Sequence, residues 1–157
     1  MINDVDEATN GVKLSLYADD SATWKTGSNL KAIIKEVQCY LDRLAMFFFE
    51  QWGFKLSSEK TVAILFTRNR NCRADDINLT TGGKIIKVEK TVRFLGVIFD
   101  RELTWAPHIK HIEERCNNRL KLMRVMTGTR WSASKKVLLI VYKALIRSVI
   151  DYGCIAL

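Results

Sequence analysis

Apolar and polar residues alternate near the start of the chain, and this pattern predicts a β-hairpin. Residues 12–16 alternate between apolar and other side chains, beginning and ending with an apolar one. A period of two is typical of a half-buried strand. Residues 20–25 follow as a possible second strand, so we expect a short hairpin that reverses at Ala18 and Asp19.

The period then lengthens to three and four residues, which indicates a long amphipathic helix. The apolar positions begin at Leu30 and continue into an aromatic-rich stretch. Ser28 or Asn29 is available as the N-cap, and Gly53 is a plausible stop signal. We therefore expect one long amphipathic helix that ends near Trp52.

The middle of the chain contains short β-rich segments. Residues 61–66 predict a buried strand, and residues 77–80 and 85–88 flank Thr-Gly-Gly-Lys, which predicts a hairpin. Residues 91–99 predict one further strand with Gly96 inside it. A glycine at such a position indicates a bulge or a close approach by another backbone.

After Asp100 the pattern becomes helical throughout. One helix is expected to end at Gly128, and a second, capped by Ser132 or Ser134, is expected to end near Gly153. The predicted apolar stripe of the first helix consists of Ile109, Ile112, Cys116, Leu120, Met123 and Met126. The chain is thus predicted to be an α+β body over residues 1–100, followed by an α-helical module over residues 101–157.

The charge distribution changes at the same place. The chain carries 25 Lys and Arg against 17 Asp and Glu, a net charge of +8. Residues 1–100 hold 14 basic and 13 acidic residues, whereas residues 101–157 hold 11 basic and 4 acidic residues. A nearly neutral body with a strongly basic helical segment points to a polyanionic partner such as nucleic acid.

Composition excludes several classes of protein. The hydrophobic fraction of 48% is too high for a disordered chain. No apolar run reaches the length of about 18 residues that a membrane span needs, and the acidic N-terminus lacks a signal-peptide core. We therefore expect no membrane partner and a location inside the cell, in the cytoplasm or the nucleus. The four cysteines form no C-x-x-C pair and are expected to be free thiols.

The sharpest chemical signal is Tyr17-Ala18-Asp19-Asp20 at the tip of the predicted hairpin. Adjacent carboxylates repel unless a cation or solvent separates them. Such a pair can hold Mg²⁺, which prefers carboxylate and phosphate oxygens and can promote phosphoryl transfer. The alternative is an ordinary solvated turn, because Asp stabilises turns through local hydrogen bonds.

Taken in order along the chain, several segments resemble reverse transcriptases of non-LTR (LINE-like, jockey-type) retrotransposons. Tyr-Ala-Asp-Asp resembles the catalytic motif of that family. Residues 53–61 resemble its L-N-x-x-K-T segment, although Ser57 stands where the family usually has Asn. Residues 92–97 with Asp100, Trp105 and His108 resemble its Y-L-G-V…D…L-x-W…H segment, and residues 139–153 resemble its thumb.

The resemblance implies a fold and a reaction. Residues 1–100 would be part of a polymerase palm, an antiparallel sheet with one long packed helix, and residues 101–157 part of a thumb. Asp19 and Asp20 would be catalytic metal ligands for Mg²⁺, or for Mn²⁺ in its place. The enzyme would extend a primer 3′-hydroxyl with deoxynucleotides on an RNA or DNA template by two-metal phosphoryl transfer.

Other residues receive roles from the same resemblance. Tyr17 would support the hairpin or approach the primer terminus; the alternative is a half-buried strand residue. Lys60 would lie near the phosphates of the incoming nucleotide, where a lysine can neutralise or protonate the pyrophosphate leaving group. The alternative is a solvated lysine. Phe94, Leu95 and Gly96 would form the primer grip, and the alternative is a bulge that only curves the sheet.

The basic residues of the helical module are candidate phosphate ligands. A solvated helix face is the alternative reading of the same residues. His108, His111 and Cys116 could share a helix face and suggest zinc, but no fourth ligand is evident, and a structural or solvent-facing role is favoured. On the first helix of this module, the candidates for binding nucleic acid are Arg115, Arg119, Lys121 and Arg124.

Parts that a polymerase of this family needs are not found in the sequence. Only 18 residues precede Asp19, and no earlier strand with a third carboxylate is evident among them. We therefore expect a fragment that is inactive by itself. The alternatives are a non-catalytic retroelement remnant that binds nucleic acid and a decayed remnant with no function. The oligomeric state does not follow from the sequence.

Overall fold

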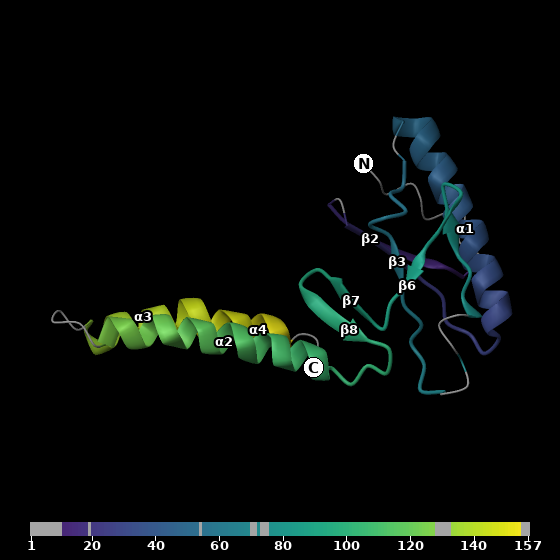
Figure 1. The fold of residues 1–157 in the computed structure, drawn as a ribbon. Helices are drawn as coiled ribbons and strands as arrows, with labels where there is room; N and C mark the ends of the chain where they lie inside the picture. Colours follow the sequence, from purple (N-terminus) through teal and green to yellow (C-terminus); the bar gives the residue numbers. More distant parts are fainter. Residues whose placement is uncertain are drawn as a thin grey trace. The chain divides into compact units, whose positions relative to one another are not determined.

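The computed structural model separates into two compact units, Met1–Val92 and Arg93–Leu157, and each is considered by itself. The units meet somewhat earlier in the chain than the change in composition near residue 100. The parts of the chain that the structure describes are residues 11–18, 20–53, 55–69, 72, 76–127 and 133–154 (Figure 1).

The first unit opens with the predicted hairpin. Strand β1 (Lys13–Tyr17) pairs antiparallel with strand β2 (Asp20–Trp24), and Tyr17 lies opposite Asp20. Ala18 has a φ of 54°, in the left-handed region that tight hairpin turns require. The hairpin and the position of its reversal are therefore confirmed, whereas Asp19 itself lies outside the described residues.

Helix α1 (Leu30–Trp52) is also confirmed, together with both of its end signals. The Asn29 side chain accepts hydrogen bonds from the backbone N–H groups of Lys31 (3.1 Å) and Ala32 (3.3 Å). This satisfies two of the N–H groups that a helix start leaves unpaired. Gly53 has a φ of 67°, and its N–H donates to the carbonyl of Phe49, as in a glycine C-cap.

Two hydrophobic clusters pack against α1, so this helix supports the whole first unit. One cluster joins it to the hairpin: Val12, Tyr40 and Leu44, with Leu14, Phe48 and Leu56 against them. The other joins it to the β-rich middle segment: Leu41, Ile77, Leu79 and Ile86, with Ile34, Val37, Ala63, Leu65 and Val88. Burial of this apolar surface is the main force holding these elements together.

The strands of the middle segment are shorter than predicted. Strand β3 (Val62–Ala63) pairs in parallel with β6 (Lys87–Val88), and β4 (Thr80–Thr81) pairs antiparallel with β5 (Lys84–Ile85). The prediction of a buried strand over residues 61–66 is wrong in length and in burial. A strand extends only as far as a neighbour supplies hydrogen-bonding groups, and β6 supplies them for two residues.

The expected single antiparallel sheet is accordingly replaced by small pairs. The described residues form four two-stranded sheets, one of them parallel. Gln38 of α1 ties one of these pairs to the helix. Its side-chain amide accepts from the Thr80 N–H at 2.8 Å and donates to the Thr80 carbonyl at 3.0 Å, as a neighbouring strand would. The α+β class is confirmed.

A further hairpin stands where one continuous strand was predicted. Strand β7 (Thr91–Phe94) is followed by the turn residues Leu95 and Gly96 and then by β8 (Val97–Asp100). Leu95 has a φ of 48° and Gly96 a φ of 81°. Positive φ at both central residues is the signature of a type I′ hairpin turn. Gly96 therefore reverses the chain, and the expectation of a bulge within one strand is wrong.

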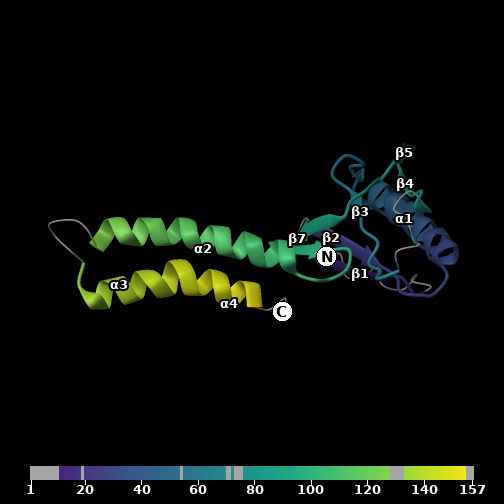
Figure 2. The same ribbon diagram turned by 60° about the horizontal axis from the view of Figure 1, so that its bottom comes forward.

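The second unit continues as two antiparallel helical segments that lie side by side (Figure 2). Helix α2 spans Ala106–Thr127. The returning segment consists of α3 (Lys135–Tyr142), a π-helical stretch η3 (Lys143–Arg147) and α4 (Ser148–Cys154). Ser134 caps α3 by accepting from the Val137 N–H at 3.5 Å. The two helices are confirmed; Gly128 and Ser132 lie outside the described residues.

The buried stripe of α2 differs from the predicted one. Ile109 and Leu120 are exposed by 48% and 37%. His108 and Arg119 take their places in the stripe because each side chain reaches a backbone partner inside the unit. The more buried positions of α2 within this stripe are His108, Ile112, Cys116, Arg119, Met123 and Met126. Polar residues thus enter a stripe that hydrophobicity alone assigned to aliphatic side chains.

The buried positions of the returning segment, which contains the π-helical stretch, also differ from the predicted ones. The i to i+5 hydrogen bonding of that stretch widens the helical turn, and Ile146 within the stretch is buried, as is Val149 in the helix that follows. The helical spacing of apolar residues in this segment predicts that Val137 is inside, but it is 44% exposed. Within the part of the chain that the structure describes, no helix is long and apolar enough to cross a membrane.

Candidate functional site

The tip of the first hairpin presents Tyr17 and Asp20. Directly opposed residues of an antiparallel pair project to the same face of the hairpin, so these two side chains share a face. Both are exposed, Tyr17 by 65%. No other described residue donates a hydrogen bond to the Asp20 carboxylate or forms an ion pair with it. The alternative prediction for Tyr17 was a half-buried strand residue, and the observed exposure is greater than that.

Asp20 suits a hard cation chemically. An exposed, unpartnered carboxylate offers the oxygen ligands that Mg²⁺ prefers. Its predicted partner Asp19 lies outside the described residues. Among the residues that are described, no group of three or more His, Cys, Asp or Glu side chains comes together as a metal site would require.

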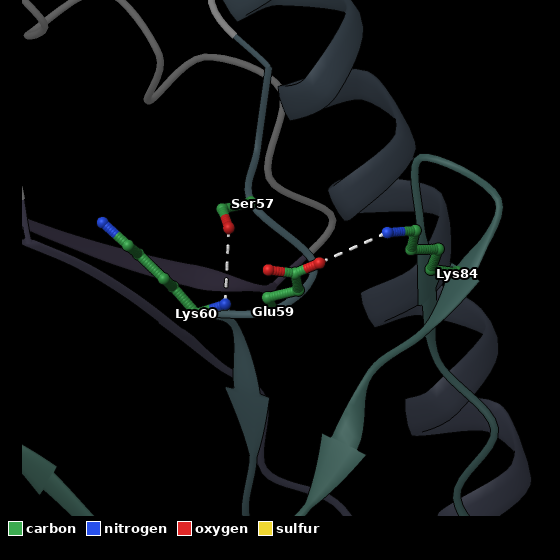
Figure 3. A network of polar contacts seen from close by, with 4 residues as sticks. All are labelled: Ser57, Glu59, Lys60 and Lys84. Atoms are coloured by element: carbon green, nitrogen blue, oxygen red, sulfur yellow. Dashed lines mark hydrogen bonds and ion pairs between the residues drawn. The ribbon is translucent and has the colours of Figure 1, made fainter.

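Lys60 lies in a tight turn of the same unit (Figure 3). Ser57 shapes this turn: its Oγ accepts from the Lys60 N–H at 3.4 Å, and its carbonyl accepts from the Thr61 N–H at 3.0 Å and hydroxyl at 2.7 Å. The family usually has Asn at the position of Ser57, so the hydrogen bonding of this loop was an open question. The serine supplies that hydrogen bonding. Short polar side chains commonly stabilise turns in this way.

The Lys60 side chain extends away from that turn. Its neighbour Glu59 pairs instead with Lys84, at 3.4 Å between Oε1 and Nζ, and the Lys60 ammonium points in another direction (Figure 3). Lys60 is exposed, and its ammonium forms no ion pair with the other described residues. It remains free to meet an anion.

The tip and second strand of the β7–β8 hairpin are tied to the rest of the second unit at three points. The Tyr152 hydroxyl of α4 donates to the Leu95 carbonyl at the tip. The Ile98 N–H of β8 donates to His108 Nδ1 at 3.3 Å. Asp100 closes the far end of β8. The predicted primer-grip residues Phe94, Leu95 and Gly96 therefore stand on a rigid support.

Asp100 organises the connection from β8 to α2. One carboxylate oxygen accepts from the Thr104 N–H and hydroxyl, each at 2.9 Å, and the other accepts from the Trp105 N–H at 2.8 Å. Burial raises the pKa of this carboxyl, but the hydrogen bonds from Thr104 and Trp105 outweigh that effect, and the pKa lies below its ordinary value. Asp100 is therefore held as a buried carboxylate.

The histidines of α2 are not arranged as a zinc site with Cys116. His108 is only 2% exposed, and its Nδ1 is the acceptor from Ile98, which places the proton on Nε2 in the neutral ring. Nε2 of His108 and Nε2 of His111 are buried and meet no hydrogen-bond partner among the described residues. The geometry assigns His108 to the packing between β8 and the helices.

Three of the four basic candidates on α2 are exposed: Arg115, Lys121 and Arg124. Arg119 differs, since its guanidinium donates to the Leu145 carbonyl within the π-helical stretch and so ties α2 to the returning helix. Lys121 makes only a local contact with Asn118 at 3.3 Å. Arg119 packs inward and is therefore not part of the α2 surface that is available to phosphates.

Several contributors were not singled out from the sequence as site residues. They are Asp100, Tyr152 and Gly153, all within segments that carry the family resemblance. In the sequence, the signal for these residues was that they lie within those segments. What each one touches depends on how the hairpin and the helices pack, and no local pattern indicates that.

Comparison with known proteins identifies the class to which these segments are similar. The chain is 26% identical over 153 residues to the RNA-directed DNA polymerase from mobile element jockey of Drosophila melanogaster, covering 97% of this chain and 16% of that protein. It is 25% identical over 140 residues to the probable RNA-directed DNA polymerase from transposon BS of the same species, covering 89% of this chain and 15% of that protein.

A third relative is the Retrovirus-related Pol polyprotein from type-1 retrotransposable element R1 4 of Nasonia vitripennis. It is 27% identical over 152 residues, covering 87% of this chain and 38% of that protein. The resemblance to reverse transcriptases of non-LTR retrotransposons, jockey among them, is thereby confirmed. The chain spans well under half the length of the curated relatives it matches. No protein-family profile and no solved structure matches it.

We predict that Asp100→Asn destabilises the protein by about 1–3 kcal/mol near neutral pH, because an amide cannot accept every hydrogen bond that the carboxylate accepts. A carboxyl whose pKa is lower in the folded state stabilises it above the pKa of the unfolded chain. That contribution is lost as the pH falls through the folded pKa.

Urea unfolding at about pH 7 and about pH 3 measures both effects. The stability difference between the natural protein and Asp100→Asn is expected to shrink at the lower pH. Glu102→Gln, an exposed carboxylate in the same loop, is the matched control. A difference that stays constant over this pH range would contradict the assignment of Asp100 as a stabilising carboxylate.

Proposed function

We propose that this chain contributes the second half of the palm and the start of the thumb to an RNA-directed DNA polymerase of the non-LTR type. The observation that carries the proposal is Asp20, which is exposed at the hairpin tip opposite Tyr17 and has no partner among the other described residues. Asp19 precedes it in the sequence. The similarity to retrotransposon polymerases over most of the chain supports the same conclusion. The partners would be a primed RNA or DNA template and deoxynucleoside triphosphates.

Asp19 and Asp20 would hold the catalytic Mg²⁺, or Mn²⁺. When bound, such an ion supplies electrostatic stabilisation of the attacking and leaving oxygens in phosphoryl transfer. The hairpin's contribution is to hold carboxylate oxygens at the end of two paired strands, in contact with solvent and with an incoming polyanion. The Tyr17 ring shares a face with Asp20 and would border the primer terminus.

Lys60 would bind the phosphates of the incoming nucleotide. Its ammonium is exposed and directed away from the Glu59–Lys84 ion pair. A lysine in this role neutralises developing charge on the leaving pyrophosphate and can donate a proton to it. The Ser57 turn would fix the position from which Lys60 reaches the phosphates.

The tip of the β7–β8 hairpin would contact the primer backbone, and the exposed basic residues of α2 would contact template or primer phosphates. Phe94, Leu95 and Gly96 belong to the tip, where a turn without bulky side chains at Gly96 permits close approach. Arg115, Lys121 and Arg124 carry the charge of α2. Phosphate contacts of this kind position a nucleic acid without reading its sequence.

Metal binding at the hairpin tip provides the test of the proposal. Titration with Mn²⁺, followed by paramagnetic broadening of backbone resonances, is expected to broaden residues 17–20 first. Asp20→Asn should weaken the effect about tenfold or more, since it removes a charged ligand. Glu50→Gln, an exposed carboxylate on α1, is the control. Broadening that is uniform over the surface, or unchanged in Asp20→Asn, would contradict the proposed metal site.

A second prediction concerns activity. The 157 residues alone are expected not to extend a primer, because a two-metal site needs a further carboxylate and the described residues bring none to the tip. Incorporation of labelled deoxynucleotides on a primed RNA template measures this. Template-dependent extension that disappears on Asp19→Ala would overturn the expectation of inactivity and would establish catalysis by this chain.

A third prediction concerns the basic helix. Binding to duplex nucleic acid is expected to be micromolar or weaker and to fall steeply with salt, as non-specific phosphate contacts do. Lys121→Ala and Arg124→Ala should each lower the salt slope by about one. Lys31→Ala on α1, likewise exposed, is the control. Binding that is independent of salt, or unaffected by both substitutions, would exclude α2 as the interface.

Binding without Mn²⁺ localisation at the hairpin tip would instead favour the alternative function, a non-catalytic nucleic-acid-binding remnant. The metal titration and the salt series therefore separate the two candidates.

A further inference from the structure

We propose that Tyr152 is a positioning residue: it holds the tip of the β7–β8 hairpin in one conformation through the Leu95 carbonyl. The effect of this positioning on the primer terminus rests on the proposed function. The bond joins residues 57 positions apart in the sequence, from the last described turn of α4 to the hairpin turn.

Tyr152 contacts a turn, Leu95 and Gly96, whose conformation needs stabilising contacts from outside the hairpin. Leu95 has a φ of 48° and carries a branched side chain. Residues other than glycine, asparagine and aspartate rarely occupy the left-handed region, because Cβ crowds the backbone there. Such conformations persist where surrounding contacts determine them. The hydrogen bond from the Tyr152 hydroxyl is such a contact, and it acts on the strained residue itself.

The Tyr152 ring adds a second contact at the next residue. A Cβ placed on Gly96 would lie 3.4 Å from Tyr152 Cε1 and 3.6 Å from its hydroxyl oxygen. The ring therefore faces Gly96 from the side on which a side chain would stand, at a distance that one methyl group would fill. The hydroxyl thus binds Leu95, and the ring faces the other residue of the turn.

Tyr152 can act as a support because α4 is itself fixed. The next residue, Gly153, is buried, and a Cβ at that position would overlap Ile112 Cδ1 of α2 and lie 3.7 Å from His108 Nε2. The two helices thus approach each other closely at Gly153. His108 in turn accepts from the Ile98 N–H of β8. The strand, both helices and the tip form one connected arrangement.

The position of Tyr152 also indicates what its hydroxyl is for. The residue is 51% exposed, so its hydroxyl is not needed to satisfy a buried core. The N–H groups of the two turn residues are not part of the ladder between β7 and β8, and backbone N–H groups are common phosphate donors. Holding the turn fixed would hold these donors in the orientation that a primer phosphate meets.

Tyr152→Phe removes only the hydroxyl and is the decisive variant; Tyr142→Phe, an exposed tyrosine on α3, is the control. Hydrogen exchange of the amides of Phe94 and Val97, the strand residues on either side of the turn, is the first measurement. In Tyr152→Phe it is expected to accelerate about fivefold, the factor that corresponds to one ordinary net hydrogen bond. The melting midpoint should fall by only a few degrees, and the exchange of α2 amides that open locally should stay unchanged. Unchanged exchange at Phe94 and Val97 would overturn the positioning role.

The second measurement compares affinity for a primer–template with a recessed 3′ end and for a blunt duplex of equal length. The natural protein is expected to prefer the recessed end, and Tyr152→Phe to lose about fivefold of that preference with blunt-duplex affinity unchanged. A merely structural role would not separate the two ligands. If the natural protein shows no preference, the link to the primer is refuted, whereas the exchange result still decides whether Tyr152 holds the turn.

Discussion

The arrangement of the second unit depends on the buried carboxylate of Asp100. It stands at the last residue of β8 and accepts three hydrogen bonds from Thr104 and Trp105. The loop between contains two non-glycine residues with positive φ, Leu103 at 53° and Trp105 at 62°. A conformation of this kind needs compensating contacts. The Asp100 carboxylate supplies them, and it thereby sets where α2 begins and which of its faces meets the hairpin.

The first unit has a different organising element. Helix α1 provides one wall for two hydrophobic clusters, one with the Tyr17–Asp20 hairpin and one with the short strands around β3 and β6. Its Gln38 amide adds a directed link to β4. Asp20 of the proposed metal site therefore stands on a helix-supported hairpin. The exposed basic residues of α2 belong to the other unit, whereas Lys60, which is also proposed to bind phosphates, belongs to the first.

The local features were predictable and the non-local ones were not. Asn29 and Gly53 mark the ends of α1 because a cap acts within one turn. The hairpin at residues 17–20 was predictable from alternation in the same way. By contrast, Gly96 was expected inside one strand, as a bulge or a point of close backbone approach. Only the pairing of β7 with β8 reveals it as half of a turn. Arg119 was expected at a phosphate-binding surface, yet it bonds to a carbonyl of the π-helical stretch, a feature no periodicity indicated.

The sequence by itself therefore determined the order of elements, the α+β class, the basic helical segment and the resemblance to non-LTR reverse transcriptases. Those properties follow from residue types and short spacings. The tertiary structure alone decided that His108 is buried under β8 and that Tyr152 reaches Leu95. The physical reason is that a hydrogen bond between distant residues requires its donor and acceptor atoms to approach within about 3 Å. That approach is set by the packing of whole elements, which the pattern along a single strand or helix does not encode.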